Sequence, residues 1–324
     1  MTRNLKIAIV AVMVIGVAAA AIVALKKRSG SGNFVEYPML MESDIPTAVA
    51  VGPDKTVWFT IDFGDAVGMI RDGKLHRLPK PKKSVEPVGM AVDAQGVAWF
   101  TDPTEVLISS IRPDGTIKSY PLGTAIARLA RLAVAPDGAV WFAESTAFSF
   151  TRLKDGVLTR HVPKSANGQP YGMAVDSQGN AWGTLQSTNQ IVRISPSGEI
   201  SEYEIPTRGS APSDIAVDAS GKAWFLEFRP HKIGSFADGK FAEFDVPGEW
   251  GGLTGLTVAP DGSVWFGLLR MQTLGRLRNG EFRMFKLPRP TARPYTLAAD
   301  AEGNIWYADI SGYVGMLKAE VAKK

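Results

Sequence analysis

Seven of the eight tryptophans recur at an almost constant interval along this 324-residue chain. Neighbouring members of the series are 41 or 42 residues apart, and they are Trp58, Trp99, Trp141, Trp182, Trp224, Trp265 and Trp306. Only Trp250 falls outside this register. A period of roughly 20 to 50 residues is typical of repeat architectures. We therefore expect seven copies of one structural unit, although the length alone would suggest two domains.

The sequence around each tryptophan predicts two strands joined by a tight turn. Two copies read PVGMAVDAQGVAWFTD and PYGMAVDSQGNAWGT. Apolar and β-branched residues precede the turn, and Gly stands three residues before the tryptophan in every copy except the first, which has Lys55. Gly readily supplies the positive φ that such a turn needs. A second turn signal, such as Asp72-Gly73, then leads into another pair of alternating segments.

Four strands per unit, repeated at this period, are typical of a β-propeller. The predicted fold is all-β, a seven-bladed β-propeller of four-stranded blades spanning residues 33–324. The last unit ends without a fourth strand, whereas residues 32–37 have the fourth-strand sequence pattern found at residues 198–203. We expect residues just after position 32 to complete the last blade and close the ring.

The amino-terminal segment predicts a membrane anchor. Residues 7–25 contain 19 uncharged, mostly apolar residues with basic residues on both sides. At about 1.5 Å per residue, a helix of this length just crosses a hydrocarbon core of about 30 Å. We expect residues 1–28 to form one N-terminal transmembrane helix, or alternatively a cleaved signal segment, and residues 29–32 a tether. The body is then expected outside the cytoplasm, in the periplasm or secreted.

Charge and cysteine content exclude several classes of function. The chain has 36 basic and 32 acidic residues, but residues 1–28 hold five of the basic ones and no acid. The remainder therefore has 31 basic and 32 acidic residues, a net charge of −1, which gives no support for a nucleic-acid partner. The absence of cysteine excludes disulfides, thiolate metal sites and a cysteine nucleophile.

The predicted binding surface is the face formed by the connections that vary between units. Variable loops on a rigid scaffold commonly carry function. Candidate ligand-binding residues on this face are Glu86, Arg131, Tyr171, Asp214, Trp250 and Tyr295. The expected partner is a small molecule or a protein.

A second set of polar residues on this face is a candidate metal site. Acidic residues stand three positions after four of the tryptophans, at Asp102, Glu144, Glu227 and Asp309. Convergent carboxylates could hold Mg²⁺ or Ca²⁺. Alternatively they cap turns or pair with Arg128, Arg131, Arg270 and Arg293. His231 is a candidate ligand or base, or else a surface residue, and the other two histidines fall in predicted outer strands.

The repeated P-x-G-[IM]-A-V-D/P-x-x-G-x-x-W-F-T-[ED] unit resembles that of the virginiamycin B lyase, or streptogramin lyase, family. The resemblance implies a seven-bladed propeller and a magnesium-assisted C–O elimination that opens a cyclic depsipeptide ester. It also implies histidines eleven residues before the tryptophan in neighbouring blades. Here that position holds no histidine, but Thr47, Val88, Ala130, Tyr171, Ser213, Thr254 and Tyr295.

Three hypotheses follow, and no catalytic residue is assigned. The first is a membrane-anchored propeller that binds a ligand or partner without lyase chemistry, because the family's histidines are missing. The alternative is an enzyme, either a metal-dependent lyase of the virginiamycin B lyase type or a lactonase-like hydrolase, that uses the four acids and His231. The third is a scaffold for a membrane assembly.

Overall fold

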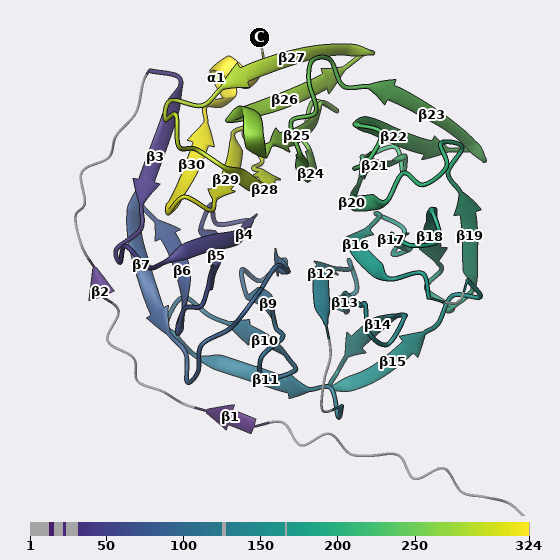
Figure 1. Cartoon of the computed structure of the whole chain (residues 1–324). Coiled ribbons are helices and arrows are strands. Elements are labelled where there is room, and N and C mark those ends of the chain that lie inside the picture. The colour runs from purple at the N-terminus through teal and green to yellow at the C-terminus, as the bar shows by residue number, and fades with distance from the viewer. Residues whose placement is uncertain (1–12, 16–21, 24–31, 125–127, 166, 324) are drawn as a thin grey trace, which may run out of the picture.

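The computed structural model describes residues 13–15, 22–23, 32–124, 128–165 and 167–323. These residues form seven antiparallel sheets arranged like the blades of a wheel (Figure 1). Each blade has four strands from the axis outward, and the last blade takes its outermost strand from residues near the start of the chain. In the sheets of blades 1 and 2, a short strand from the first 31 residues is paired outside the fourth strand. The predicted seven-bladed all-β propeller is confirmed.

The strand bounds follow the repeat. Blades 1 and 2 contain β4 (Ile45–Val51), β5 (Val57–Asp62), β6 (Ala66–Arg71) and β7 (Lys74–Pro79), then β8 (Met90–Val92), β9 (Ala98–Asp102), β10 (Leu107–Ile111) and β11 (Ile117–Pro121). Blades 3 and 4 contain β12 (Leu129–Val134), β13 (Val140–Glu144), β14 (Ser149–Lys154) and β15 (Val157–His161), then β16 (Pro170–Val175), β17 (Ala181–Leu185), β18 (Gln190–Ile194) and β19 (Ile200–Glu204).

The remaining blades follow the same order. Blades 5 and 6 contain β20 (Pro212–Val217), β21 (Ala223–Glu227), β22 (Lys232–Ala237) and β23 (Lys240–Asp245), then β24 (Leu253–Val258), β25 (Val264–Leu268), β26 (Thr273–Arg278) and β27 (Glu281–Lys286). Blade 7 contains β28 (Pro294–Ala299), β29 (Ile305–Asp309), β30 (Tyr313–Leu317) and β3 (Phe34–Pro38). The helices of the described part of the chain are η1 (Leu269–Met271) and α1 (Ala319–Ala322).

The hydrophobic core lies between neighbouring blades, which explains why apolar residues recur at the same positions of each repeat. Trp58 of blade 1 belongs to a buried cluster that also holds Met90 and Phe100 of blade 2. Trp265 of blade 6 is buried with Leu297 and Tyr307 of blade 7. Each blade therefore buries one sheet face against the next blade, and the repeated tryptophan fills the gap between them.

The first turn of each blade has the backbone conformation that its sequence predicts. The six glycines three residues before the tryptophan have φ between 77° and 89°. Lys55, the exception in the sequence, has a φ of 66° and so adopts the same left-handed conformation. The turn geometry is thus shared by all seven blades.

The ring closes as expected. β3 pairs antiparallel with β30, with Glu36 opposite Gly315. The Glu36 carboxylate is buried, and it accepts hydrogen bonds from the Tyr307 hydroxyl (3.0 Å) and from Arg289 Nε (3.0 Å). These two bonds join side chains that are more than 250 residues apart in the sequence.

The predicted transmembrane helix is not confirmed. Most of residues 7–25 lie outside the described residues, and the two described pieces are short strands. β1 (Met13–Ile15) pairs with β11, and β2 (Ile22–Val23) pairs with β7. No helix within the described ranges is both long enough and apolar enough to cross a membrane. Membrane anchoring and the location of the body stay predictions.

Candidate functional site

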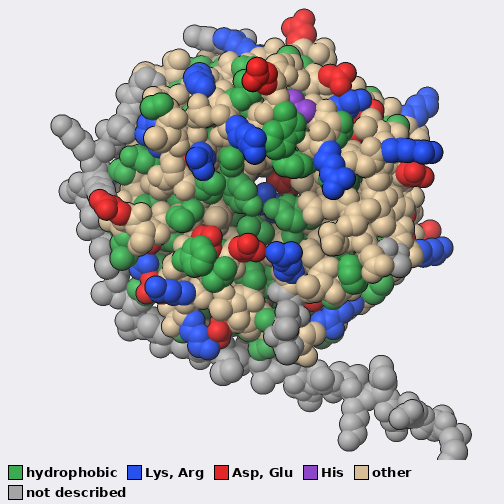
Figure 2. All heavy atoms as spheres, viewed as in Figure 1, with side chains coloured by type: hydrophobic (Ala, Val, Ile, Leu, Met, Phe, Trp, Pro, Cys, Tyr) green, Lys and Arg blue, Asp and Glu red, His purple; other side chains and the backbone are tan. Residues whose placement is uncertain are grey.

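A hollow lined by both polar and apolar side chains lies at the centre of the face made by the variable connections. Two adjoining cavities of about 600 and 750 Å³ share Gln169, Tyr171, Gln186 and Tyr295, and together we call them the central hollow. Figure 2 looks onto this face and shows the depression at its centre, with hydrophobic and charged side chains around it. The position eleven residues before each repeated tryptophan lines the hollow in every blade.

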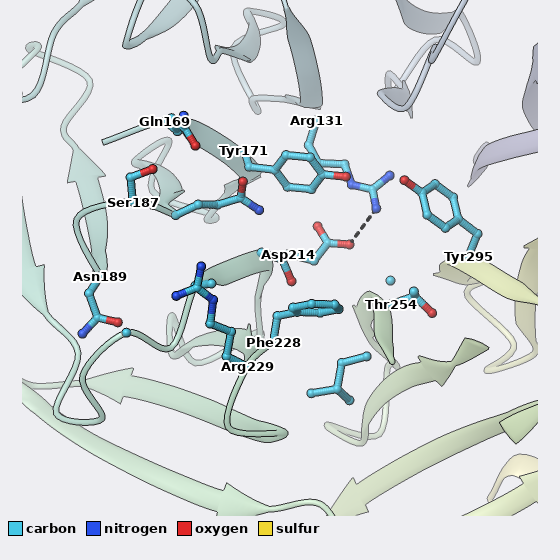
Figure 3. Close-up of a pocket in the computed structure, with 16 residues that line it drawn as sticks. Arg131, Gln169, Tyr171, Ser187, Asn189, Asp214, Phe228, Arg229, Thr254 and Tyr295 are labelled. Carbon is cyan, nitrogen blue, oxygen red and sulfur yellow. Dashed lines mark ion pairs between the residues drawn. The ribbon is translucent and has the colours of Figure 1, made fainter. Parts of the chain in front are cut away.

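An arginine held between two tyrosines lies deep in this hollow. The guanidinium of Arg131, from β12, lies 5.7 Å from the ring centre of Tyr171 and 5.9 Å from that of Tyr295. Its Nη2 is 3.3 Å from Asp214 Oδ2, and its Nη1 donates a hydrogen bond of 2.6 Å to the Val88 carbonyl. Figure 3 shows both phenol groups directed at the guanidinium. The cluster joins five blades across the axis.

Burial determines the protonation states of this cluster. The side chains of Arg131 and Asp214 are only 11% and 12% exposed. Burial is the largest single effect and lowers the pKa of Arg131, but Asp214 together with Tyr171 and Tyr295 outweighs it, so the arginine pKa is raised overall. Burial also raises the pKa of Tyr171, and the positive charge of Arg131 only partly offsets this effect. Arg131 is therefore charged and Tyr171 neutral at ordinary pH, so Tyr171 is a poor proton acceptor.

The walls of the hollow combine amide, hydroxyl and charged side chains. Gln169, Gln186 and Arg229 line the part near blades 4 and 5, while Glu86 and Arg128 line the part near blades 1 to 3. The sequence prediction named Glu86 but missed the two glutamines and Arg229. Gln186 and Arg229 follow their tryptophans by four and five positions, one and two beyond the position that we considered.

Trp250 lies beside the hollow but does not line it. Its ring is 40% exposed and packs edge-on against Phe228, with ring centres 5.3 Å apart. Its Nε1–H donates to the Phe228 carbonyl at 3.2 Å, and the Arg270 guanidinium lies 4.6 Å from its ring centre. Because Phe228 does line the hollow, Trp250 supports one wall from behind.

The four candidate metal ligands are not brought together. Asp102 pairs with Lys80 at 3.1 Å, Glu144 with Arg160 at 3.2 Å, and Asp309 with Arg289. These cations differ from the four arginines expected as alternative partners. In the part of the chain that the structure describes, no three His, Asp or Glu side chains are grouped to hold a metal ion. Each acid ends the second strand of its own blade, and the four acids therefore lie in four different blades.

Glu227 is the exception among these acids, because it has no cation bound directly to it. It is fully buried, and neither carboxylate oxygen has a hydrogen-bond partner among the described atoms. Burial, followed by the nearby negative charge of Glu243, raises the pKa of Glu227 to about 8, although Lys232 opposes this shift. Glu227 is thus mostly protonated at neutral pH and does not line the hollow.

His231 has a structural role in the conformation shown. It is 8% exposed, and its Nε2 accepts a hydrogen bond from the Gly251 N–H at 3.3 Å. Burial lowers its pKa, which favours the neutral ring that can accept this bond. His231 therefore anchors the loop that carries Trp250. The other two histidines, His76 and His161, lie on outer strands as predicted.

The fold and the hollow define a class, the seven-bladed propellers with a central hollow on the variable face. The sequence profile of the virginiamycin B lyase family matches residues 18–153 and 99–322 of this chain. The chain belongs to the virginiamycin B lyase family. The resemblance found in the repeated unit is therefore confirmed.

Individual relatives agree with this assignment. The virginiamycin B lyase of Nocardia farcinica (strain IFM 10152) is 32% identical over 190 residues, which cover 58% of this chain and 65% of that protein. A crystal structure of virginiamycin B lyase from Staphylococcus aureus superposes with a TM-score of 0.83 at 25% identity, covering 87% of this chain and 98% of that one. A catalytically inactive histidine-to-alanine variant of the Staphylococcus aureus enzyme, crystallised with quinupristin, has the same TM-score at 26% identity and the same coverage of both chains.

Proposed function

We propose that this chain is a ligand-binding member of the family, which takes a small molecule or a peptide segment of a partner into the central hollow without lyase chemistry. One observation carries the proposal. The seven equivalent positions that line the hollow contain no imidazole, and the Arg131 ion pair lies there instead, between Tyr171 and Tyr295.

The chemistry of the hollow supports binding over elimination. An elimination needs a base whose pKa lies near the working pH. Tyr171 is held neutral by burial, and Asp214 is committed to Arg131 and to the N–H of Leu256 at 3.1 Å. The charge of Arg131 is balanced by Asp214, but its guanidinium N–H groups remain hydrogen-bond donors that suit recognition of carbonyl oxygens.

Incubation of the full chain with quinupristin, with and without Mg²⁺, tests the absence of lyase chemistry. We expect quinupristin to be recovered intact by liquid chromatography with fragment-ion mass spectrometry. Elimination adds no atoms, so a linear product would have the same mass but a different retention time and different fragments. Its appearance would refute the proposal in favour of a lyase.

The hydrolase alternative predicts a different product. A lactonase-like reaction adds one water molecule, so the product mass would rise by that amount. Calorimetric titration with Mg²⁺ and Ca²⁺ gives a second measurement. Binding at millimolar metal that is lost in both Glu144→Gln and Glu227→Gln would favour the metal-dependent enzyme. We expect no such binding, because these carboxylates lie in separate blades.

A further inference from the structure

Two side chains of opposite charge lie at opposite ends of the central hollow. Arg229 belongs to the loop between the second and third strands of blade 5, and Glu86 belongs to the connection from blade 1 to blade 2. Three to four blades of seven separate these positions, so they lie across the axis from one another. Neither side chain has an ion-pair partner of opposite charge among the described residues.

Backbone hydrogen bonds hold the two acidic residues at this end of the hollow in place. The Glu86 backbone N–H donates to Asp62 Oδ1 at 2.7 Å, and the N–H of Phe63 donates to the same oxygen at 3.0 Å. Both carboxylates line this part of the hollow together with one arginine, Arg128, so the carboxylates outnumber the guanidinium there. A cation that donates hydrogen bonds fits this end better than a quaternary ammonium, which is usually recognised by aromatic faces.

The basic end is suited to one carboxylate. Arg229 is exposed to the hollow, and its loop is fixed by a backbone hydrogen bond from the Arg229 N–H to the Ser210 carbonyl at 3.1 Å. A guanidinium binds a carboxylate through two parallel hydrogen bonds. The other arginine of this half, Arg131, is already neutralised by Asp214. This half therefore has one positive charge available.

Side-chain amides line the space between the two ends. The carboxamides of Gln169 and Gln186 make no mutual hydrogen bond, and both line both halves of the hollow. Each carboxamide can donate and accept hydrogen bonds, as a peptide group does. The two volumes of about 600 and 750 Å³ are in the range for ligands of drug-like size or short peptides.

From this arrangement we propose that the ligand is a short linear peptide with both ends free. Its ammonium group lies at Glu86 and Asp62, its carboxylate lies at Arg229, and its amide groups face Gln169 and Gln186. The inference rests on the proposed binding function and specifies its ligand class. A cyclic or end-blocked peptide lacks the two charges and loses both interactions.

Calorimetric titration of the full chain with four forms of one peptide tests this assignment. The probes are tetra-alanine, its N-acetyl form, its C-terminal amide and the form blocked at both ends. We expect the free peptide to bind tightest, and each single block to weaken binding about tenfold, because each removes one charge-assisted interaction. Tri- and penta-alanine measured alongside report which length spans the two ends.

Two variants test which end of the peptide each charged residue of the hollow binds. In Glu86→Gln the penalty for N-acetylation shrinks, while the penalty for the C-terminal amide is unchanged. In Arg229→Gln the pattern is reversed. Glu199→Gln and Arg71→Gln are matched controls, since both residues are exposed and lie at turns between third and fourth strands, away from the hollow. We expect both control variants to keep both penalties.

The outcomes separate this inference from the proposed function. Equal binding of the free and doubly blocked peptides, penalties that neither variant alters, or no binding of any probe would each overturn the peptide assignment. None of these results produces an opened quinupristin ring, which is the outcome that refutes the proposed function. Unchanged melting temperatures of the variants show that the altered affinities do not arise from unfolding.

Discussion

Single residues at one repeat position have very different surroundings. Glu144 and Glu227 both end the second strand of a blade, and both are fully buried. The outer strand of blade 3 supplies Arg160 to Glu144, whereas the equivalent position in blade 5 holds Glu243. A buried carboxylate without a cation is held in its neutral form. The residue at this outer-strand position thus decides whether the carboxylate two strands away has a cation bound to it.

The substitution Glu227→Gln is expected to stabilise the protein at alkaline pH. The folded pKa of Glu227, about 8, lies above its ordinary value of 4.5. Unfolding therefore releases a proton between these pH values, so this group lowers stability progressively from about pH 4.5 to about pH 8. We expect the variant to melt close to wild type at pH 5 and on the order of 5 °C higher at pH 8.

Melting curves from pH 5 to pH 9 measure this effect. Glu144→Gln is the control with the opposite sign, because it breaks the ion pair with Arg160 and leaves that cation without its partner. A difference between Glu227→Gln and wild type that stays constant with pH would show that Glu227 does not titrate in this range.

At the scale of elements, the first turn of each blade shows how one backbone shape tolerates different residues. Six turns use Gly in the left-handed conformation, and the first blade uses Lys55 with the same sign of φ. A side chain in this conformation costs free energy that Gly avoids. The exception in the sequence therefore keeps the fold at a small local cost.

Exchanging the residues at this turn position should have opposite effects in two blades. Lys55→Gly is expected to stabilise by about 0.5 kcal/mol, since relief of strain exceeds the loss of the exposed ion pair with Glu302. Gly96→Lys is expected to destabilise by about 1 kcal/mol. No atom lies within 4 Å of a Cβ added at Gly96, so the cost there is conformational.

Urea denaturation midpoints measure both changes. Lys55→Ala separates the two contributions, because it removes the ion pair but keeps a side chain at positive φ. If Lys55→Ala stabilised the protein as much as Lys55→Gly, backbone strain would not be the cause.

At the scale of the whole molecule, stability depends on closure of the ring by β3. β3 buries Phe34 and Tyr37 and satisfies Tyr307 and Arg289 through Glu36. A chain that begins at residue 40 lacks this strand and leaves the edge of β30 open. Compared with a chain that begins at residue 32, we expect its melting temperature to fall by about 10 °C or more.

A peptide of residues 32–39 added to the shorter chain provides the control. If β3 acts by pairing with β30, the peptide should recover part of the lost stability, and a peptide with Glu36→Ala should recover less. Equal melting temperatures of the two chains would contradict the view that β3 closes the ring.

The repeat accounts for most of what could be predicted. Each blade has the same tryptophan, turn and strand pattern. The number of blades, the order of the strands and the closing strand could therefore be predicted from the local sequence. The family resemblance pointed to the position eleven residues before each tryptophan, and the structure places this position in the central hollow in every blade. In a repeat protein with a fixed period, side chains at the same position of each repeat occupy the same place in each repeated unit.

Contacts between side chains of different strands were beyond such reasoning. The pairing of Arg131 with Asp214, the separate cations at Asp102, Glu144 and Asp309, and the isolation of Glu227 depend on side chains from distant segments. Local periodicity determines which strands form and where they lie, because backbone pairing and burial are short-ranged. Which charges meet depends on long side chains that reach across strands and between blades, and only the folded structure brings them within reach.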